Sequence, residues 1–221
     1  SEFNIIPRFK RIFVKKNIIK LFNINFDIFI RTILITFAFL WFTYKSSEIS
    51  EDYLAVNSIL LQFIILAAFF LDAYAFSTEG VVGFSLGRKV LKTFMFAVNN
   101  SFKLSFYTSL IISLIFLFFF KSIVNILTDI EYLRFLSYEF IIWILLIPPI
   151  SSFCYQYDGI FIGTSQTKDM RNSMIISVSI YIFISIFLTD NYNNHGLWLS
   201  LLVFMLLRSL TLKFYFSNIL K

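Results

Sequence analysis

The stretch FFLDAYAFSTEGVVGFSLGRK, residues 69–89, places two carboxylates, Asp72 and Glu79, inside sequence that is otherwise typical of a membrane helix. The two acids are seven residues apart, which is nearly two turns of an α-helix, so they project from the same face about 10 Å apart. A carboxylate at the centre of a bilayer costs a few kcal/mol even on the scale derived from insertion experiments. We therefore predict that this face points toward protein or water inside a helical bundle, and away from lipid.

The composition of the chain is that of an integral membrane protein. Of its 221 residues, 58% are hydrophobic and 14% are charged, whereas about a quarter of the residues of a soluble domain carry charge. The apolar runs are continuous and not alternating, which favours membrane helices over the strands of a barrel. The single cysteine, Cys154, excludes an internal disulfide, and the sequence contains no known metal-binding, catalytic or nucleotide-binding motif. We expect no enzymatic activity, no cofactor and no metal site.

Six segments are long and apolar enough to cross a bilayer, which takes about 20 residues. They are residues 27–44, 53–85, 90–120, 132–163, 171–189 and 197–217. The prediction is an all-α integral membrane protein in which residues 27–221 form a six-helix bundle and residues 1–26 form a basic segment beside the membrane. Contact of this segment with anionic membrane lipid, at roughly 1 kcal/mol per basic residue, accounts for much of the net charge of +6 without a nucleic-acid partner.

Lys and Arg are distributed unequally between the two ends of these helices. Thirteen lie in the termini and connections of one side, and three, Lys45, Lys121 and Arg134, lie on the other. By the positive-inside rule the richer side is cytoplasmic, so both termini are predicted to lie in the cytoplasm. Arg31 falls near one end of its predicted span, from which its long side chain is expected to extend to the membrane surface.

A third carboxylate, Asp158, lies in CYQYDGIFIGT, residues 154–164. Pro148 and Pro149 precede it and are predicted to break the helix and to free backbone carbonyls. A broken helix that carries an acid is a recurrent feature of transporters. Small residues allow helix backbones to approach closely, and the sequence has them beside the acids at Gly80, Gly83, Gly87, Gly159 and Gly163.

Two interpretations of the three acids are open at this point. In the first, Asp72, Glu79 and Asp158 bind protons, a cation or a cationic substrate in a polar cavity, since ionisable residues inside a membrane are usually functional. In the second, each acid is half of a structural ion pair inside the bundle, and Lys103 and Arg208 are the candidate counter-ions. For Asp158 a further alternative is a capping role near the cytoplasmic end of its helix.

Three stretches of the sequence resemble one transporter family. LAVNSILLQFIILAAFFLDAYAFSTEGVVGFSLGRK, residues 54–89, resembles the eighth helix of multidrug and toxic compound extrusion (MATE) transporters of the DinF-like branch. YDGIFIGTSQTKDMRNSM, residues 157–174, is similar to the tenth helix of that branch and its passage into the eleventh. NHGLWLSLLVFMLLRSLTL, residues 194–212, is similar to its last helix. One departure is Asp72-Ala73, where the family pattern has Asp-Gly.

The resemblance implies a fold and an activity. Members have twelve helices in two six-helix lobes, and this chain matches helices seven to twelve, so we expect it to be the C-terminal lobe, separated from an N-terminal lobe that the sequence lacks. The implied activity is export of small organic cations across the inner membrane in exchange for H⁺ or Na⁺. By position, Asp158 matches an acid implicated in the cation site of this lobe, and Asp72 and Glu79 match acids typical of the branch.

Two other functions are weighed against cation-coupled export. A flippase for lipid-linked precursors, from the same superfamily, needs several cationic side chains that face the cavity to hold a pyrophosphate headgroup. A membrane scaffold subunit that does not transport needs all its acids neutralised in fixed pairs, with no open cavity. The three acids and the few basic residues within the spans favour the exporter.

Overall fold

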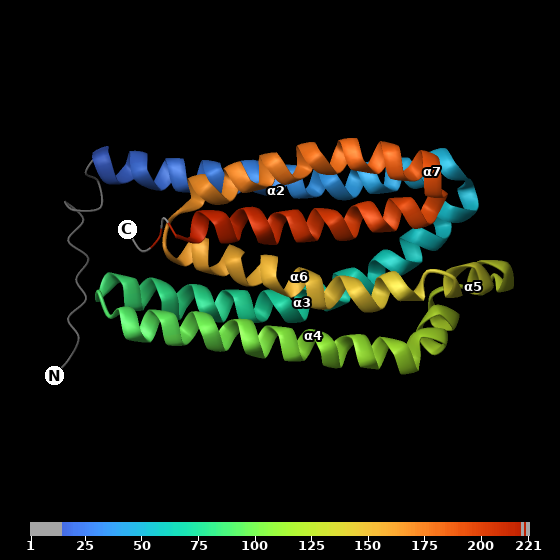
Figure 1. Ribbon diagram of the computed structural model, residues 1–221, viewed down its shortest axis with the longest axis horizontal. Coiled ribbons are helices and arrows are strands. Elements are labelled where there is room, and N and C mark those ends of the chain that lie inside the picture. The colour runs from blue at the N-terminus through green and yellow to red at the C-terminus, as the bar shows by residue number, and fades with distance from the viewer. Residues whose placement is uncertain (1–14, 218, 220–221) are drawn as a thin grey trace.

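The computed structural model describes residues 15–217 and residue 219, and this part of the chain contains helices and no strands (Figure 1). The elements are α2 (Lys15–Ile49), α3 (Glu51–Gly87), α4 (Leu91–Leu127), α5 (Glu131–Tyr138), α6 (Ile141–Gly163) and α7 (Thr167–Phe216). α2, α3, α4 and α7 are each long and apolar enough to cross a membrane, and α5 and α6 pass the same test as a bent pair. The prediction of an all-α membrane bundle is confirmed.

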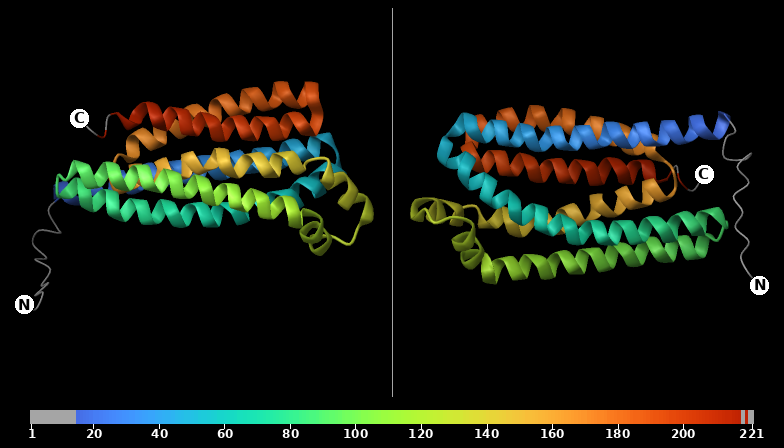
Figure 2. Two further views of the ribbon diagram at one scale, coloured as in Figure 1. Left: turned by 60° about the horizontal axis from the view of Figure 1, so that its bottom comes forward. Right: turned by 180° about the vertical axis from the view of Figure 1, so that it is seen from behind.

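α7 contains the fifth and sixth predicted spans. It has 50 residues and reverses direction at Asn193, whose backbone has φ 49° and ψ −134°. Its two arms, residues 167–192 and 194–216, run side by side in opposite directions (Figures 1 and 2). The reversal is so tight that a Cβ atom at Gly196 would collide with the carbonyl oxygen of Leu188. Since one pass needs about 20 residues, α7 supplies two passes, and the number of passes is the six predicted.

The fourth predicted span is bent at a different place from the one expected. The chain breaks between α5 and α6, around Glu139, with an angle of 55° between the two helices. Pro148 and Pro149, predicted to break the helix, lie inside an uninterrupted α6. The carbonyl of Leu145, which would accept from a backbone N–H at position 149, accepts instead from Ser113 Oγ of α4 at 2.9 Å. The neighbouring helix therefore satisfies a group that proline leaves unpaired, and α6 continues.

The first helix begins earlier than the first predicted span. Residues 15–26 are helical and continuous with the first span, so α2 begins twelve residues before the predicted start of that span. Residues 1–14 of the predicted basic segment lie outside the described residues. This extension changes the position of Arg31, which is sixteen residues from the start of α2 and not near its end.

The basic connections gather at one end of the bundle. The start of α2, the α3–α4 turn, the α6–α7 turn and the end of α7 lie together at that end in Figure 1. The α2–α3 turn, α5 and the reversal of α7 lie at the opposite end. The large apolar side chains that remain exposed, such as Phe69, Phe76, Phe118, Phe183 and Phe214, cover the outside of the bundle, as a lipid-facing surface requires.

Candidate functional site

The three acids come together because α3 and α6 pack closely. A Cβ atom at Gly159 would collide with the carbonyl oxygen of Ala75, and one at Gly163 with that of Glu79. At Gly83 an added Cβ would lie 2.8 Å from the carbonyl oxygen of Gly163. The absence of side chains at these glycines lets the two backbones touch, which places the acidic face of α3 beside Asp158.

The other two glycines of the predicted stripe have a different environment. An added Cβ at Gly80 or Gly87 meets no atom within 4 Å among the described residues. The prediction that all three glycines of α3 serve close packing is therefore wrong for two of them. Of these three glycines, Gly83 is the one that lies on the side of α3 that faces α6.

Substitution of these glycines gives a test of the packing. Gly163→Leu is expected to lower the unfolding free energy by about 1–3 kcal/mol, because the added side chain must displace the α3 backbone. Gly80→Leu, the matched control, is expected to leave stability unchanged or slightly higher, since leucine is the better helix former. Thermal unfolding in detergent measures both variants. Equal stabilities of the two variants would contradict the close α3–α6 contact.

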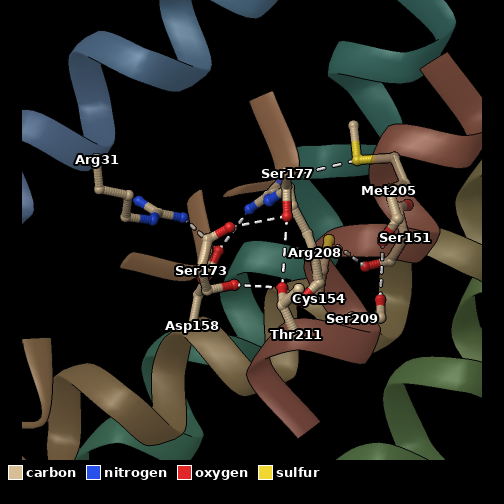
Figure 3. A network of polar contacts seen from close by, with 10 residues as sticks. All are labelled: Arg31, Ser151, Cys154, Asp158, Ser173, Ser177, Met205, Arg208, Ser209 and Thr211. Carbon is tan, nitrogen blue, oxygen red and sulfur yellow. Dashed lines mark hydrogen bonds and ion pairs between the residues drawn. The ribbon is translucent and has the colours of Figure 1, made fainter. Parts of the chain in front are cut away.

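Asp158 is the centre of the site and is 4% exposed. Its Oδ2 atom accepts from Arg208 Nη2 at 2.7 Å and also from the guanidinium of Arg31 (Figure 3). The two arginines reach it from different elements, Arg31 from α2 and Arg208 from the second arm of α7. The other oxygen, Oδ1, is buried without a hydrogen-bond partner among the described residues.

The two arginines differ in how firmly they are held. The Arg208 side chain is fully buried, its Nη1 atom lies 3.5 Å from the sulfur of Met205, and its guanidinium lies 5.6 Å from the ring centre of Phe204 and 5.9 Å from that of Tyr155. Cation–π contacts of this kind favour a buried cation. The Arg31 side chain is 17% exposed, and within the described residues Asp158 is its hydrogen-bond partner.

Asp72 and Glu79 line one cavity of about 240 Å³ together with Arg31 and Asp158. Both acids are half-buried and form no ion pair with any described residue. Three carboxylates against two guanidinium groups leave this region with one net negative charge when all are ionised. No group of three or more His, Cys, Asp or Glu side chains with metal-binding geometry occurs in the described part of the chain.

One of the two predicted counter-ions is correct and the other is not. Arg208 pairs with Asp158 as expected, but Lys103 is exposed on α4 and makes no salt bridge with the described residues. The second counter-ion is Arg31, which the sequence analysis assigned to the membrane surface. The error came from the predicted start of the first span at residue 27, which put Arg31 one turn from a helix end. Continuity of the helical pattern back to Lys15 is the signal that would have placed it deep in the bundle.

A second ion pair fixes α2 to α7 one helical turn before Arg31. Asp27 is buried, accepts from Arg171 Nη1 at 2.6 Å and accepts from Thr167 Oγ1 at 3.1 Å. Asp27 and Arg31 are four residues apart and therefore lie on the same face of α2. α2 packs mainly along α7 and less along α3.

Together these features define a multi-pass helical membrane protein with a buried acidic site at a crossing of two helices. Comparison with known proteins gives the family: the model of the family described as MatE matches residues 28–188, so the chain belongs to that family. The resemblance seen in the sequence is confirmed. The chain is also similar to DNA damage-inducible protein F of Escherichia coli strain K12, with 29% identity over 196 residues. That match covers 89% of this chain and 42% of the relative, so the chain spans less than half of the relative's length.

Proposed function

We propose that this chain forms one six-helix lobe of a cation-coupled exporter of small organic cations, with Asp72, Glu79 and Asp158 as the cation-binding acids. The observation that carries the proposal is the shared cavity, which brings acids from two helices together inside a membrane bundle. Ionisable groups in such a place are rare and are usually functional. Membership of the MatE family agrees with this assignment.

The size of the cavity limits what this lobe alone can bind. Pockets for drug-sized ligands typically measure about 300–1,000 Å³, and this cavity measures about 240 Å³. It is large enough for a proton on a carboxylate, for Na⁺ or for the charged group of a substrate. We therefore propose that the rest of the substrate is bound by a second six-helix lobe, and that the end of the bundle rich in Lys and Arg faces the cytoplasm.

The structure is a poor fit to the two alternative functions. A pyrophosphate headgroup needs free cationic side chains, but Arg31, the cation that lines the cavity, is already paired with Asp158. A scaffold subunit needs its acids neutralised, but Asp72 and Glu79 form no ion pair with the described residues. Exchange of H⁺ or Na⁺ against an organic cation uses such unpaired acids directly, because both cations compete for the same negative charge.

Neutralisation of the half-buried acids tests the proposal. Glu79→Gln is expected to weaken binding of tetramethylammonium, a cation small enough for the cavity, to the purified chain about tenfold, since a charge several ångströms away in a partly buried site contributes on the order of 1–2 kcal/mol. Asp72→Asn is expected to act in the same direction. Equilibrium dialysis at pH 7.5 in about 0.1 M salt measures the dissociation constants.

Glu131→Gln is the matched control, because Glu131 is exposed at the opposite end of the bundle. It is expected to bind like the wild type. Unchanged binding by both Glu79→Gln and Asp72→Asn, at wild-type stability, would rule out the cavity as the cation site.

A further inference from the structure

We propose that Arg31 is a tethered cation that occupies the acidic site in the absence of ligand and that must leave Asp158 when an external cation binds. Arg208, in contrast, remains as the fixed partner of Asp158. This inference rests on the proposed function, because it names the residue that competes with the bound cation. It assigns to Arg31 control over both the affinity of the site and the attachment of α2 to α6.

The first argument is the sharing of one oxygen atom. Both guanidinium groups donate to Asp158 Oδ2, while Oδ1 lies buried with no partner among the described residues. A carboxylate whose two oxygens are used so unequally has unfilled acceptor capacity. Asp158 lines the cavity together with Arg31, so a cation that binds this carboxylate from the cavity competes with the Arg31 guanidinium.

The second argument is the difference between the two arginines in solvent access. Arg208 is 0% exposed and lies against Met205 and two aromatic rings, so its removal from Asp158 leaves a charge with no solvent. The Arg31 side chain is 17% exposed and lines the cavity itself. A guanidinium that swings away from Asp158 stays within the same cavity as the carboxylates of Asp72 and Glu79. Departure of Arg31 from Asp158 therefore leaves its charge close to two other carboxylates.

The third argument concerns the elements that Arg31 connects. α2 packs along α7 and α3, and Arg31 forms an ion pair between α2 and Asp158 of α6. One turn away, Asp27 holds α2 to the start of α7 through Arg171 and Thr167. Loss of the Arg31 ion pair consequently weakens the contact between α2 and α6 while the ion pair between α2 and α7 remains. Cation binding and a change in the contact between α2 and α6 become the same event.

The charge of the site gives the expected direction of the effect. With Arg31 in place the region carries one net negative charge. With a neutral residue at position 31 it carries two. Arg31→Gln keeps a polar but shorter and uncharged side chain and leaves Asp158 its buried partner Arg208, so the variant is expected to fold. Removal of the competing charge is expected to tighten the binding of tetramethylammonium about tenfold.

The experiment measures tetramethylammonium binding by equilibrium dialysis to the purified 221-residue chain and its variants. Arg31→Lys retains a tethered cation and is expected to stay within about twofold of the wild type, as is the control Arg134→Gln, which removes an arginine at the opposite end of the bundle. Arg31→Cys is the second variant. Its treatment with aminoethyl methanethiosulfonate attaches an ammonium group and is expected to return tight binding to the wild-type value within one protein sample. Cys154 is buried, and treated wild type controls for its reaction.

Three results would overturn the inference. Wild type that binds the probe while Arg31→Gln binds it no more tightly would refute the role of Arg31 and leave the proposed function standing. Equal binding before and after modification of Arg31→Cys would do the same. Absence of binding in the wild type and in every Arg31 variant would refute both the inference and the proposed cation site.

Discussion

Replacement of Arg208 by methionine, Arg208→Met, is expected to lower the unfolding free energy of the bundle by about 1–3 kcal/mol, because Asp158 loses its fully buried charge-assisted hydrogen bond and keeps only the partly exposed Arg31 as a partner. Arg208 is the largest fully buried charged side chain of the described residues and donates to Asp158 at 2.7 Å. Methionine fills similar volume, so the loss reflects charge and not a cavity. The measurement is unfolding in mixed micelles under increasing denaturing detergent, together with the yield of folded protein.

A second substitution separates the ion pair from other causes of instability. Arg208→Met combined with Asp158→Asn removes both charges of the buried pair. It is expected to recover more than half of the loss, because Arg31, which loses its partner in this variant, is partly exposed and shares a cavity with Asp72 and Glu79. The control Arg134→Met removes an exposed arginine whose contact with Asp129 is 3.5 Å long, and it is expected to cost less than about 1 kcal/mol. An Arg208→Met protein as stable as Arg134→Met would show that the buried pair contributes nothing to the fold.

The different burial of the two arginines leads us to expect that the proposed cation binding and the stability of the fold respond to different substitutions in this site. Arg208 is fully buried in the interior of the bundle, and its replacement is expected to lower the stability of the fold. Arg31 shares the same acceptor but lies partly exposed at the cavity, and its loss is expected to change affinity with a smaller effect on stability. Asp158→Asn alone is expected to change both the cation affinity and the stability of the fold. Substitutions at Asp72 and Glu79 are therefore expected to report on binding with less change in stability.

The sequence was sufficient to predict the acidic face of α3 and its partner acid on α6. The spacing of seven residues between Asp72 and Glu79 fixes their common face whatever the tertiary structure, because it depends on helical geometry alone. Gly159 and Gly163 indicated that this helix packs closely against a neighbour, and the structure identifies the neighbour as α3. The common face of the two acids is a local property of one helix, which a sequence determines directly, whereas the partner of a packed helix is not.

Other features depended on neighbours that the sequence does not identify. Proline lacks a donor in any context, but whether a helix breaks there depends on another group, here Ser113 of α4, that satisfies the freed carbonyl. The position of Arg31 depended on where α2 begins, and helix ends are set by packing as much as by composition. Lys103 and Arg31 both interrupt apolar sequence, and only the arrangement of α2, α6 and α7 decides which one reaches Asp158.

The largest effect expected outside the acidic site is at Asn57, where Asn57→Leu is expected to lower the unfolding free energy by about 2–4 kcal/mol. Asn57 of α3 is 1% exposed, and its amide connects three elements. It donates to Ser46 of α2 at 2.8 Å and to Asn194 of α7 at 2.6 Å, and it accepts from Asn194 at 3.1 Å and from Trp198 at 2.8 Å.

Leucine has the same branched shape as asparagine, with a somewhat larger volume, but leaves the buried donors of Trp198 and Asn194 without an acceptor. Such unpaired groups carry the full cost of their desolvation, and they lie beside Asn193, where α7 reverses direction. We therefore expect the Asn57→Leu variant to lose the attachment of the α7 reversal to α2 and α3 before the rest of the bundle unfolds.

Asn191→Leu is the matched control. Asn191 is exposed, and among the described residues its side chain forms a hydrogen bond within its own helix, to the carbonyl of Phe187. Hydrogen exchange at the backbone of residues 190–198, measured in detergent, should rise strongly in Asn57→Leu and remain near the wild-type rate in Asn191→Leu. Equal protection in both variants would mean that the Asn57 network does not hold the reversal in place.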